Sequence, residues 1–243
     1  MNTAIQVITV YGLALALLPA AIVIGIMFYW SAGAKTAAYA TLRMLIQLLL
    51  IGYVLVYIFD AERPWIIIAV LMIMLAAASW IAIRPVKKKQ PHVFRNALVA
   101  ISVGGVLVLV LVSQIVIGVE PWFSPRYVVP LAGMIFAGAM NSVSLAAERL
   151  QAETDRGTPG LEARRIAFQA SLIPIINSLF AVGVVALPGM MTGQILSGIS
   201  PLVAAKYQIV VMSMLFGVSG ISAALYLLLQ GRNEIRQQAA TSR

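Results

Sequence analysis

The stretch Leu187–Gly198, LPGMMTGQILSG, lies between two long apolar runs and differs from both. It contains three glycines, one proline, two adjacent methionines, one threonine and one glutamine, and no charged residue. Glycine and proline at this density lower helix propensity, so we expect the helix to break here. Irregular backbone persists at membrane depth only where protein or water satisfies its polar groups. The stretch is therefore either a functional re-entrant segment or an ordinary turn at the membrane surface.

The rest of the chain has the composition of a membrane protein. Its 243 residues are 61% hydrophobic and 10% charged, with a mean hydropathy of +0.96, whereas soluble domains carry about 25% charged residues. We expect an all-α integral membrane protein forming one domain over residues 1–243, with no nucleotide-binding domain. The chain has no cysteine and one histidine, His92. Disulfides, thiolate metal sites and histidine clusters are thereby excluded.

Seven apolar segments approach or exceed the roughly 20 residues that a spanning helix needs. The connection between the second and third is only four residues long and is followed by Pro64, a favourable first residue of a helix. These two segments should form a tight hairpin, and the glycine-rich break lies between the last two. The expected spans are Ala4–Phe28, Ala37–Phe59, Pro64–Ile83, Asn96–Gly118, Tyr127–Ala147, Ile166–Leu187 and Tyr207–Leu229.

The distribution of basic residues predicts the orientation. With the N-terminus outside and the C-terminus inside, 14 of the 17 lysines and arginines are cytoplasmic, and only Arg63, Arg126 and Lys206 are outside. This agrees with the positive-inside rule. The net charge of +9 therefore indicates contact with the lipid bilayer, and no nucleic acid is expected. The cytoplasmic set is Lys35, Arg43, Arg84, Lys87, Lys88, Lys89, Arg95, Arg149, Arg156, Arg164, Arg165, Arg232, Arg236 and Arg243.

Polar residues and methionines inside the spans are the candidates for a substrate pathway, because intramembrane polar groups are costly. Each also has a plainer interpretation: Arg43 can reach the headgroups, amides and hydroxyls can join helices, and methionines can fill the core. Prolines and glycines near the break are candidates for a gate or hinge. The pathway candidates are Arg43, Gln47, Met140, Asn141, Ser142, Ser144, Asn177, Met190, Met191 and Gln194, and the gate candidates are Pro174, Pro188, Gly189 and Gly193.

Several function classes are disfavoured. The spans contain no paired carboxylates, which argues against a proton-driven carrier, and no nucleophile–base or metal constellation supports a membrane enzyme. No metal site is assigned. The chain lacks a Walker A motif, so any ATP hydrolysis must occur on another chain. The alternative is an ATP-independent channel or facilitator with a re-entrant loop at 187–198.

The sequence resembles a known family at several places. It resembles the permease subunits of the Fet-type iron-export ABC transporters, in which similar pieces occur in the same order along the chain. In chain order, the matching pieces are RMLIQLLLIGYVLV, GMIFAGAMNSVSLAAERL, SLIPIINS, LPGMMTGQILSGISP and AAKYQIVVM. These subunits are related to plant permease proteins linked to aluminium tolerance. Together the matching pieces cover most of the chain.

The resemblance implies a multi-pass permease subunit of the cell inner (plasma) membrane. It would export iron or another metal ion, bind no cofactor itself, and work as a homodimer with a cytosolic ABC ATPase that holds ATP. One departure is the short segment ERLQAETDRGTPGLEARR, whose TPGLEA portion resembles a remnant of the longer coupling segment. There we expect Thr158 to cap the helix before Pro159. The coupling candidates are Glu148, Arg149, Thr158, Glu162 and Arg164.

Overall fold

The computed structural model describes residues 9–59, 63–87 and 91–241, with side chains as far as residue 231. These residues are almost entirely helical, with one isolated β-bridge between Val182 and Ala186, which confirms the all-α prediction. The chain divides into two compact units, Met1–Asp60 and Ala61–Arg243. The expected hairpin connection at residues 60–62 lies outside the described residues.

The first unit contains three helices, α1 (Val10–Ala16), α2 (Leu18–Tyr29) and α3 (Ala34–Phe59). Thr9 caps α1 by accepting a 3.1 Å hydrogen bond from the backbone N–H of Gly12. The turn between α2 and α3 passes through Ser31 and Gly33, both with positive φ. Ile58 is the only described residue of this unit that is buried, so the surface of these helices is apolar and suited to lipid or to other helices.

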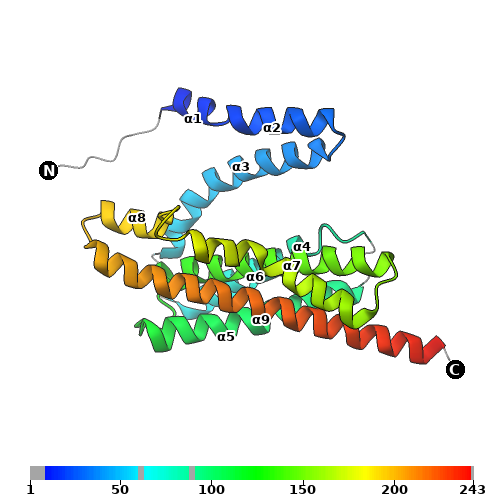
Figure 1. Cartoon of the computed structure of the whole chain (residues 1–243). Helices are drawn as coiled ribbons and strands as arrows, with labels where there is room; N and C mark the ends of the chain where they lie inside the picture. The colour runs from blue at the N-terminus through cyan, green and yellow to red at the C-terminus, as the bar shows by residue number, and fades with distance from the viewer. Residues whose placement is uncertain (1–8, 60–62, 88–90, 242–243) are drawn as a thin grey trace. The chain divides into compact units, whose positions relative to one another are not determined.

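The second unit holds the remaining helices (Figure 1). Most begin at a proline, which lacks the N–H that a first helical residue leaves unpaired anyway. Helix α5 runs directly into a π-helical segment, η1, before the loop to α6. The helices are α4 (Pro64–Ala82), α5 (Pro91–Val110), η1 (Leu111–Val116), α6 (Pro125–Asp155), α7 (Gly160–Ala181), α8 (Gly189–Leu196) and α9 (Pro201–Thr241).

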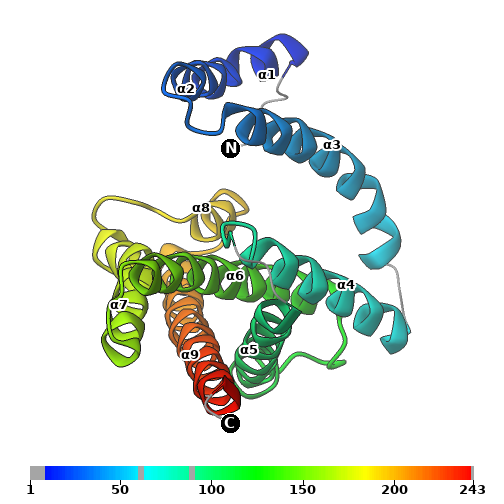
Figure 2. The ribbon, with the colours of Figure 1, turned by 90° about the vertical axis from the view of Figure 1, so that its right-hand side faces the viewer.

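Helix α6 is the centre of the second unit. It packs against α4, α5, α7 and α9, and Figure 2 shows it between α4 and α7 with α5 and α9 beneath. Small residues allow this packing: a Cβ added at Gly138 would lie 3.2 Å from the Leu215 side chain of α9, and one at Gly105 would lie 2.8 Å from the Phe136 ring. Close approach of helix backbones at glycine is the usual basis of intramembrane packing.

Six of the described helical stretches are long and apolar enough to cross a membrane. They correspond to the first five and the last of the expected spans. The sixth expected span, Ile166–Leu187, corresponds to α7, which begins with charged residues and ends six residues early, at Ala181. The chain turns there through Gly183, whose φ is +83°. The count of seven and the orientation stay predictions, and Lys88, Lys89 and Arg243 lie outside the described residues.

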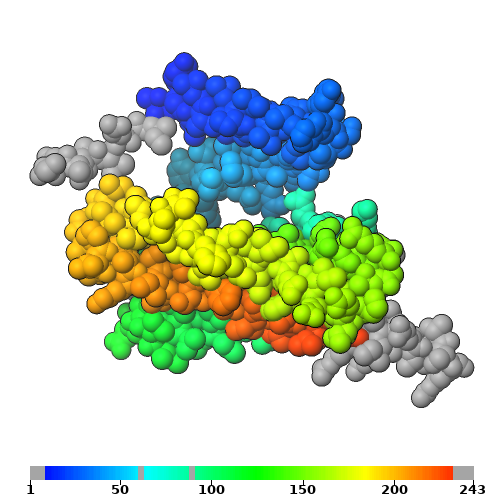
Figure 3. All heavy atoms as spheres, viewed as in Figure 1, coloured from blue at the N-terminus to red at the C-terminus, as the bar shows by residue number. Residues whose placement is uncertain are grey.

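The expectation of irregular backbone at 187–198 is wrong for its central part, because Gly189–Leu196 forms the two-turn helix α8. Pro188 precedes the first helical residue, and Thr192 donates its hydroxyl to the Pro188 carbonyl at 3.2 Å. Only Gly193 lies well inside the helix, and Gly198, with φ +90°, lies beyond its end. The glycines therefore mark the limits of a short helix more than they prevent one. In Figure 3 the yellow atoms of α8 lie beside the orange atoms that begin α9.

Candidate functional site

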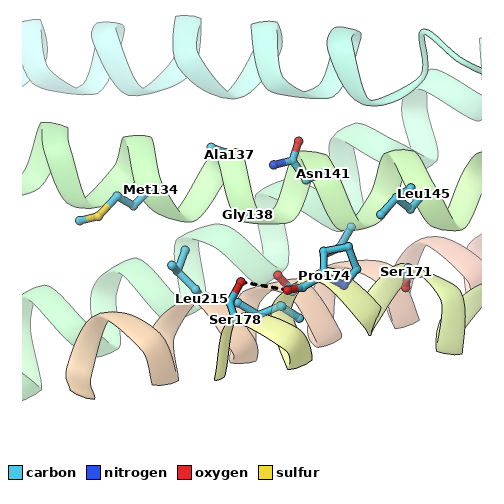
Figure 4. A pocket seen from close by; sticks show the side chains of 12 residues that line it. Met134, Ala137, Gly138, Asn141, Leu145, Ser171, Pro174, Ser178 and Leu215 are labelled. Carbon is cyan, nitrogen blue, oxygen red and sulfur yellow. Dashed lines mark hydrogen bonds between the residues drawn. The ribbon is translucent and has the colours of Figure 1, made fainter. Parts of the chain in front are cut away.

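A cavity of about 330 Å³ lies between α6, α7 and α9. Figure 4 shows it between α6, which carries Met134 and Asn141, and the segment of α7 that carries Pro174. Its walls combine aliphatic side chains with small, polar and thioether ones. The lining residues are Met134, Ala137, Gly138, Asn141, Ser142, Leu145, Ser171, Pro174, Ile175, Ser178, Leu215 and Ser219.

The polar side chains of this first cavity differ in whether they have a hydrogen-bond partner. Ser171 and Ser178 donate to carbonyls of their own helix, at 2.7 Å to Phe168 and 2.9 Å to Pro174. Asn141, Ser142 and Ser219 have no hydrogen-bond partner among the described residues, although Ser142 and Ser219 are buried. The cavity therefore presents an amide and two hydroxyls that can bind a polar guest.

A second cavity, of about 430 Å³, adjoins the first and shares Met134 with it. It lies where α6 and α9 begin and is bordered by α8. Its charged side chain is Arg126, and α8 contributes Met190 and Gln194. The Gln194 Oε1 atom is buried and has no hydrogen-bond partner among the described residues. The lining residues are Ile117, Arg126, Tyr127, Pro130, Leu131, Met134, Met190, Gln194, Ile199, Tyr207, Val210 and Val211.

The remaining pathway candidates do not line either cavity. Met140 and Ser144 are half-buried on α6, Met191 is half-buried on α8, and Asn177 is exposed on α7. Arg43 and Gln47 lie on α3 in the first unit, where both are exposed. Of the gate candidates, Pro174 lines the first cavity. Pro188 and Gly189 lie at the start of α8 and Gly193 within it.

Glu153, near the end of α6, organises the turn into α7. It is only 5% exposed, and its carboxylate accepts from Arg149 at 2.8 Å and Arg156 at 3.0 Å. The Thr158 hydroxyl also donates to it, at 2.9 Å. Glu153 is not among the residues predicted from the sequence, although its spacing of four residues from Arg149 and three from Arg156 is typical of helical ion pairs.

The predicted capping role of Thr158 is wrong. Pro159 occupies the N-cap position of α7, and the Thr158 side chain turns back to α6 because the buried Glu153 carboxylate is the stronger acceptor. The other coupling candidates lie around this turn. Glu148 is exposed, Glu162 is in the first turn of α7, and Arg164 donates to the carbonyl of Gly160 at 3.0 Å.

A second buried polar group, also missed, joins α5 to α9. The Asn96 amide donates to Gln230 at 3.1 Å, and the Gln230 amide donates to the Tyr226 hydroxyl at 2.8 Å. All three residues are buried. Asparagine and glutamine 134 positions apart give no sequence signal of contact, so this pair could not have been predicted from one sequence.

Among the described residues, no group of three or more His, Cys, Asp or Glu side chains could hold a metal ion. The donors that the two cavities offer are neutral oxygens, with the thioethers of Met134 and Met190. The arrangement is suited to passing a polar solute.

Comparison with known proteins identifies relatives. Residues 10–234 match the model of the family described as "Uncharacterised protein family (UPF0014)". The chain is 37% identical over 201 residues to "UPF0014 membrane protein slr1647" of Synechocystis, covering 74% of this chain and 75% of that protein. It is 32% identical over 201 residues to "Probable iron export permease protein FetB" of Escherichia coli, covering 75% of each.

A plant relative, "Protein ALUMINUM SENSITIVE 3" of Arabidopsis thaliana, is 34% identical over 202 residues, which cover 76% of this chain and 72% of that protein. No solved structure matches the chain. The family match extends over nearly the whole length and includes α1 to α8 and most of α9. The chain is thus a multi-pass membrane protein of the UPF0014 family.

Proposed function

We propose that this protein is the permease subunit of an ABC transporter that exports a metal ion, iron being the first to test. The observation that carries the proposal is the face of α6 that lines both cavities. From residue 126 to residue 145 the cavity-lining positions recur every three or four residues. A helix of that length rises about 28 Å, close to the roughly 30 Å of a bilayer's hydrocarbon core.

The source of energy is a separate ATPase. The turn between α6 and α7 lies at the opposite end of the second unit from α8 (Figure 1), and it carries the basic residues expected on the cytoplasmic side. An ATPase that binds one conformation more tightly than the other would shift the permease between inward-open and outward-open states. Two copies of the chain would pair with two ATPases in the inner membrane.

The named relatives support the cargo and the direction. The Escherichia coli relative is named as a probable iron export permease, and its identity of 32% extends over 201 residues, which cover 75% of this chain. Neither cavity is lined by Asp, Glu or His, so a proton relay through these side chains is disfavoured. This is the pattern expected when ATP and not a proton gradient drives transport.

The test is ATP-dependent uptake of ⁵⁵Fe²⁺ into inside-out vesicles containing the permease and its ATPase. Asn141→Ala and Gln194→Ala should each reduce the rate about fivefold, since each removes about one hydrogen bond of roughly 1 kcal/mol. Asn177→Ala is the matched control, because that amide is exposed, as is that of Asn141, but lines neither cavity. Its rate should equal that of the wild type at equal membrane abundance.

Two results would contradict the proposal. Iron flux that is equal with and without ATP would favour the channel or facilitator. Loss of permease abundance in the Asn141 and Gln194 variants, with normal transport per molecule, would make these side chains packing residues.

A further inference from the structure

The donors along the cavities are unusual for a protein that handles a divalent metal. They are hydroxyls, amides and thioethers, and none of the lining residues is an aspartate, glutamate, histidine or cysteine. Divalent iron held directly by protein normally has imidazole or carboxylate ligands. Neutral hydroxyls compensate poorly for the water that a small divalent ion must give up, and such ions are often bound with their waters retained.

The first cavity nevertheless holds polar groups that are available to a guest. Ser142 and Ser219 are 4% and 2% exposed and have no hydrogen-bond partner among the described residues. Ser79 and Ser102 show the alternative, because each donates to the carbonyl four residues earlier in its own helix, at 2.8 Å and 2.6 Å. The Ser142 and Ser219 hydroxyls make no such bond, so both can donate a hydrogen bond to a guest in the cavity.

The volume of the first cavity leaves room for a ligand shell around an ion. A water molecule occupies about 30 Å³ of liquid, so the cavity of about 330 Å³ corresponds to about eleven waters. This volume accommodates a metal ion with a complete shell of six oxygen ligands. Hydrogen bonds from Asn141 and the two serines can reach such a shell without displacing it.

Arg126 affects which charge of cargo can pass the second cavity. Its guanidinium is always charged and is the charged group in that lining. A positive charge repels an approaching divalent cation and attracts an anion. A metal complex whose ligands offset the charge of the ion would pass this point more easily than the ion alone.

We infer that the cargo travels as an oxygen-ligated metal complex that keeps its own ligand shell, which Asn141, Ser142 and Ser219 recognise by hydrogen bonds. The ligands are either water or the carboxylates of a small chelator. The inference rests on the proposed function, since it assumes that the two cavities form the pathway. It differs from that proposal in specifying that no side chain of the pathway enters the coordination sphere.

Exchange-inert complexes test this inference, because they cannot release a ligand to the protein. Cobalt(III) hexaammine mimics a cationic hydrated ion, and chromium(III) tris(oxalate) mimics an anionic carboxylate chelate. Each is added to the inside-out vesicles as a competitor of ATP-driven ⁵⁵Fe²⁺ uptake. At least one should inhibit the wild type, and its inhibitory concentration should rise about tenfold in the variant Ser142→Ala/Ser219→Ala.

Two controls locate the effect. Ser102→Ala removes a hydroxyl that bonds within α5 and lines neither cavity, so inhibition should be unchanged. The variant Arg126→Gln distinguishes a shell of water from a shell of carboxylates. If the oxalate complex is the inhibitor, this variant should weaken its effect, which supports a carboxylate chelate. If only the hexaammine complex inhibits, the shell is water.

The inference is overturned if neither inert complex inhibits, or if Met134→Leu abolishes iron uptake while the double serine variant transports normally. That second result would place a thioether in the coordination sphere. Failure of the proposed function looks different. In that case the wild type shows no ATP-dependent iron uptake at all, before any competitor is added.

Discussion

The two ends of the second unit are held in different ways. At the turn between α6 and α7, the buried Glu153 carboxylate binds Arg149, Arg156 and Thr158, all within 3.0 Å. At the other end, residues 182–200 contain no charged residue, and a Cβ added at Gly189 or Gly193 would have no neighbour within 4 Å. Several contacts to one buried carboxylate make the first end resistant to local opening, whereas sparse contacts make the α8 end easy to rearrange.

This difference suits the proposed transport cycle. A push from the ATPase at a rigid turn moves α6 as one body, because α6 is a continuous helix of 31 residues that lines both cavities. The α8 end can then respond by opening or closing the second cavity. The predictions below alter one end at a time.

The largest effect is expected at the rigid end. Glu153→Ala leaves two arginines and a threonine without their common partner, and breaking a buried ion pair costs several kcal/mol. The side chains of Arg149 and Arg156 are 39% and 65% exposed, so solvent screening reduces the loss. We expect a fall of about 2 kcal/mol in the free energy of unfolding, measured by denaturation in detergent.

Glu148→Ala is the matched control, since Glu148 is an exposed carboxylate on the same helix. It should change stability by no more than about 0.5 kcal/mol. Equal effects of the two substitutions would mean that Glu153 does not fix the turn.

An intermediate effect is expected from Gly198→Ala, just beyond the end of α8. The φ angle of Gly198 is +90°, a conformation that costs a residue with a Cβ about 1–2 kcal/mol. The end of α8 should open more often, which amide hydrogen exchange of residues 189–200 would measure as a faster rate. Gly189→Ala serves as the comparison, because Gly189 does not have a positive φ and an added Cβ there would meet nothing within 4 Å. Similar exchange in both variants would argue against strain at residue 198.

The sequence predicted the all-α architecture, the start of α4 at Pro64 and the polar character of α6. These depend on composition, on local propensity and on the position of proline, which are properties of one segment at a time. It could not predict that Ser219 of α9 shares a cavity with Asn141 of α6, because that depends on the approach of the two helices at Gly138.

Glu153 shows the same limit. Its ion pairs lie along one helix and have a detectable spacing, but its burial and its contact with Thr158 arise only when the chain turns. For α8 the prediction from local propensity is itself wrong. Glycines predict a break in the helix, but two of the three in this stretch lie at the ends of a short helix, where glycine and proline are well tolerated.

The smallest effect should come from Gly193→Ala. This substitution is the most direct test of whether the α8 end rearranges. Gly193 lies inside α8, and a Cβ there meets nothing within 4 Å. Alanine should therefore stabilise α8 by about 0.5–1 kcal/mol, through its higher helix propensity and the lower entropy of the unfolded segment. Hydrogen exchange of α8 should slow by roughly two- to fivefold, as that free energy requires.

The same variant connects local stability to transport. If α8 must rearrange before cargo leaves the second cavity, a more stable α8 should slow ATP-driven iron uptake by up to the same factor, with no change in membrane abundance. A variant with slower exchange but an unchanged uptake rate would show that α8 is a fixed wall of the cavity. The contrast between the two ends would then be one of stability alone, and the gating step would have to be sought on α7, where Pro174 borders the first cavity.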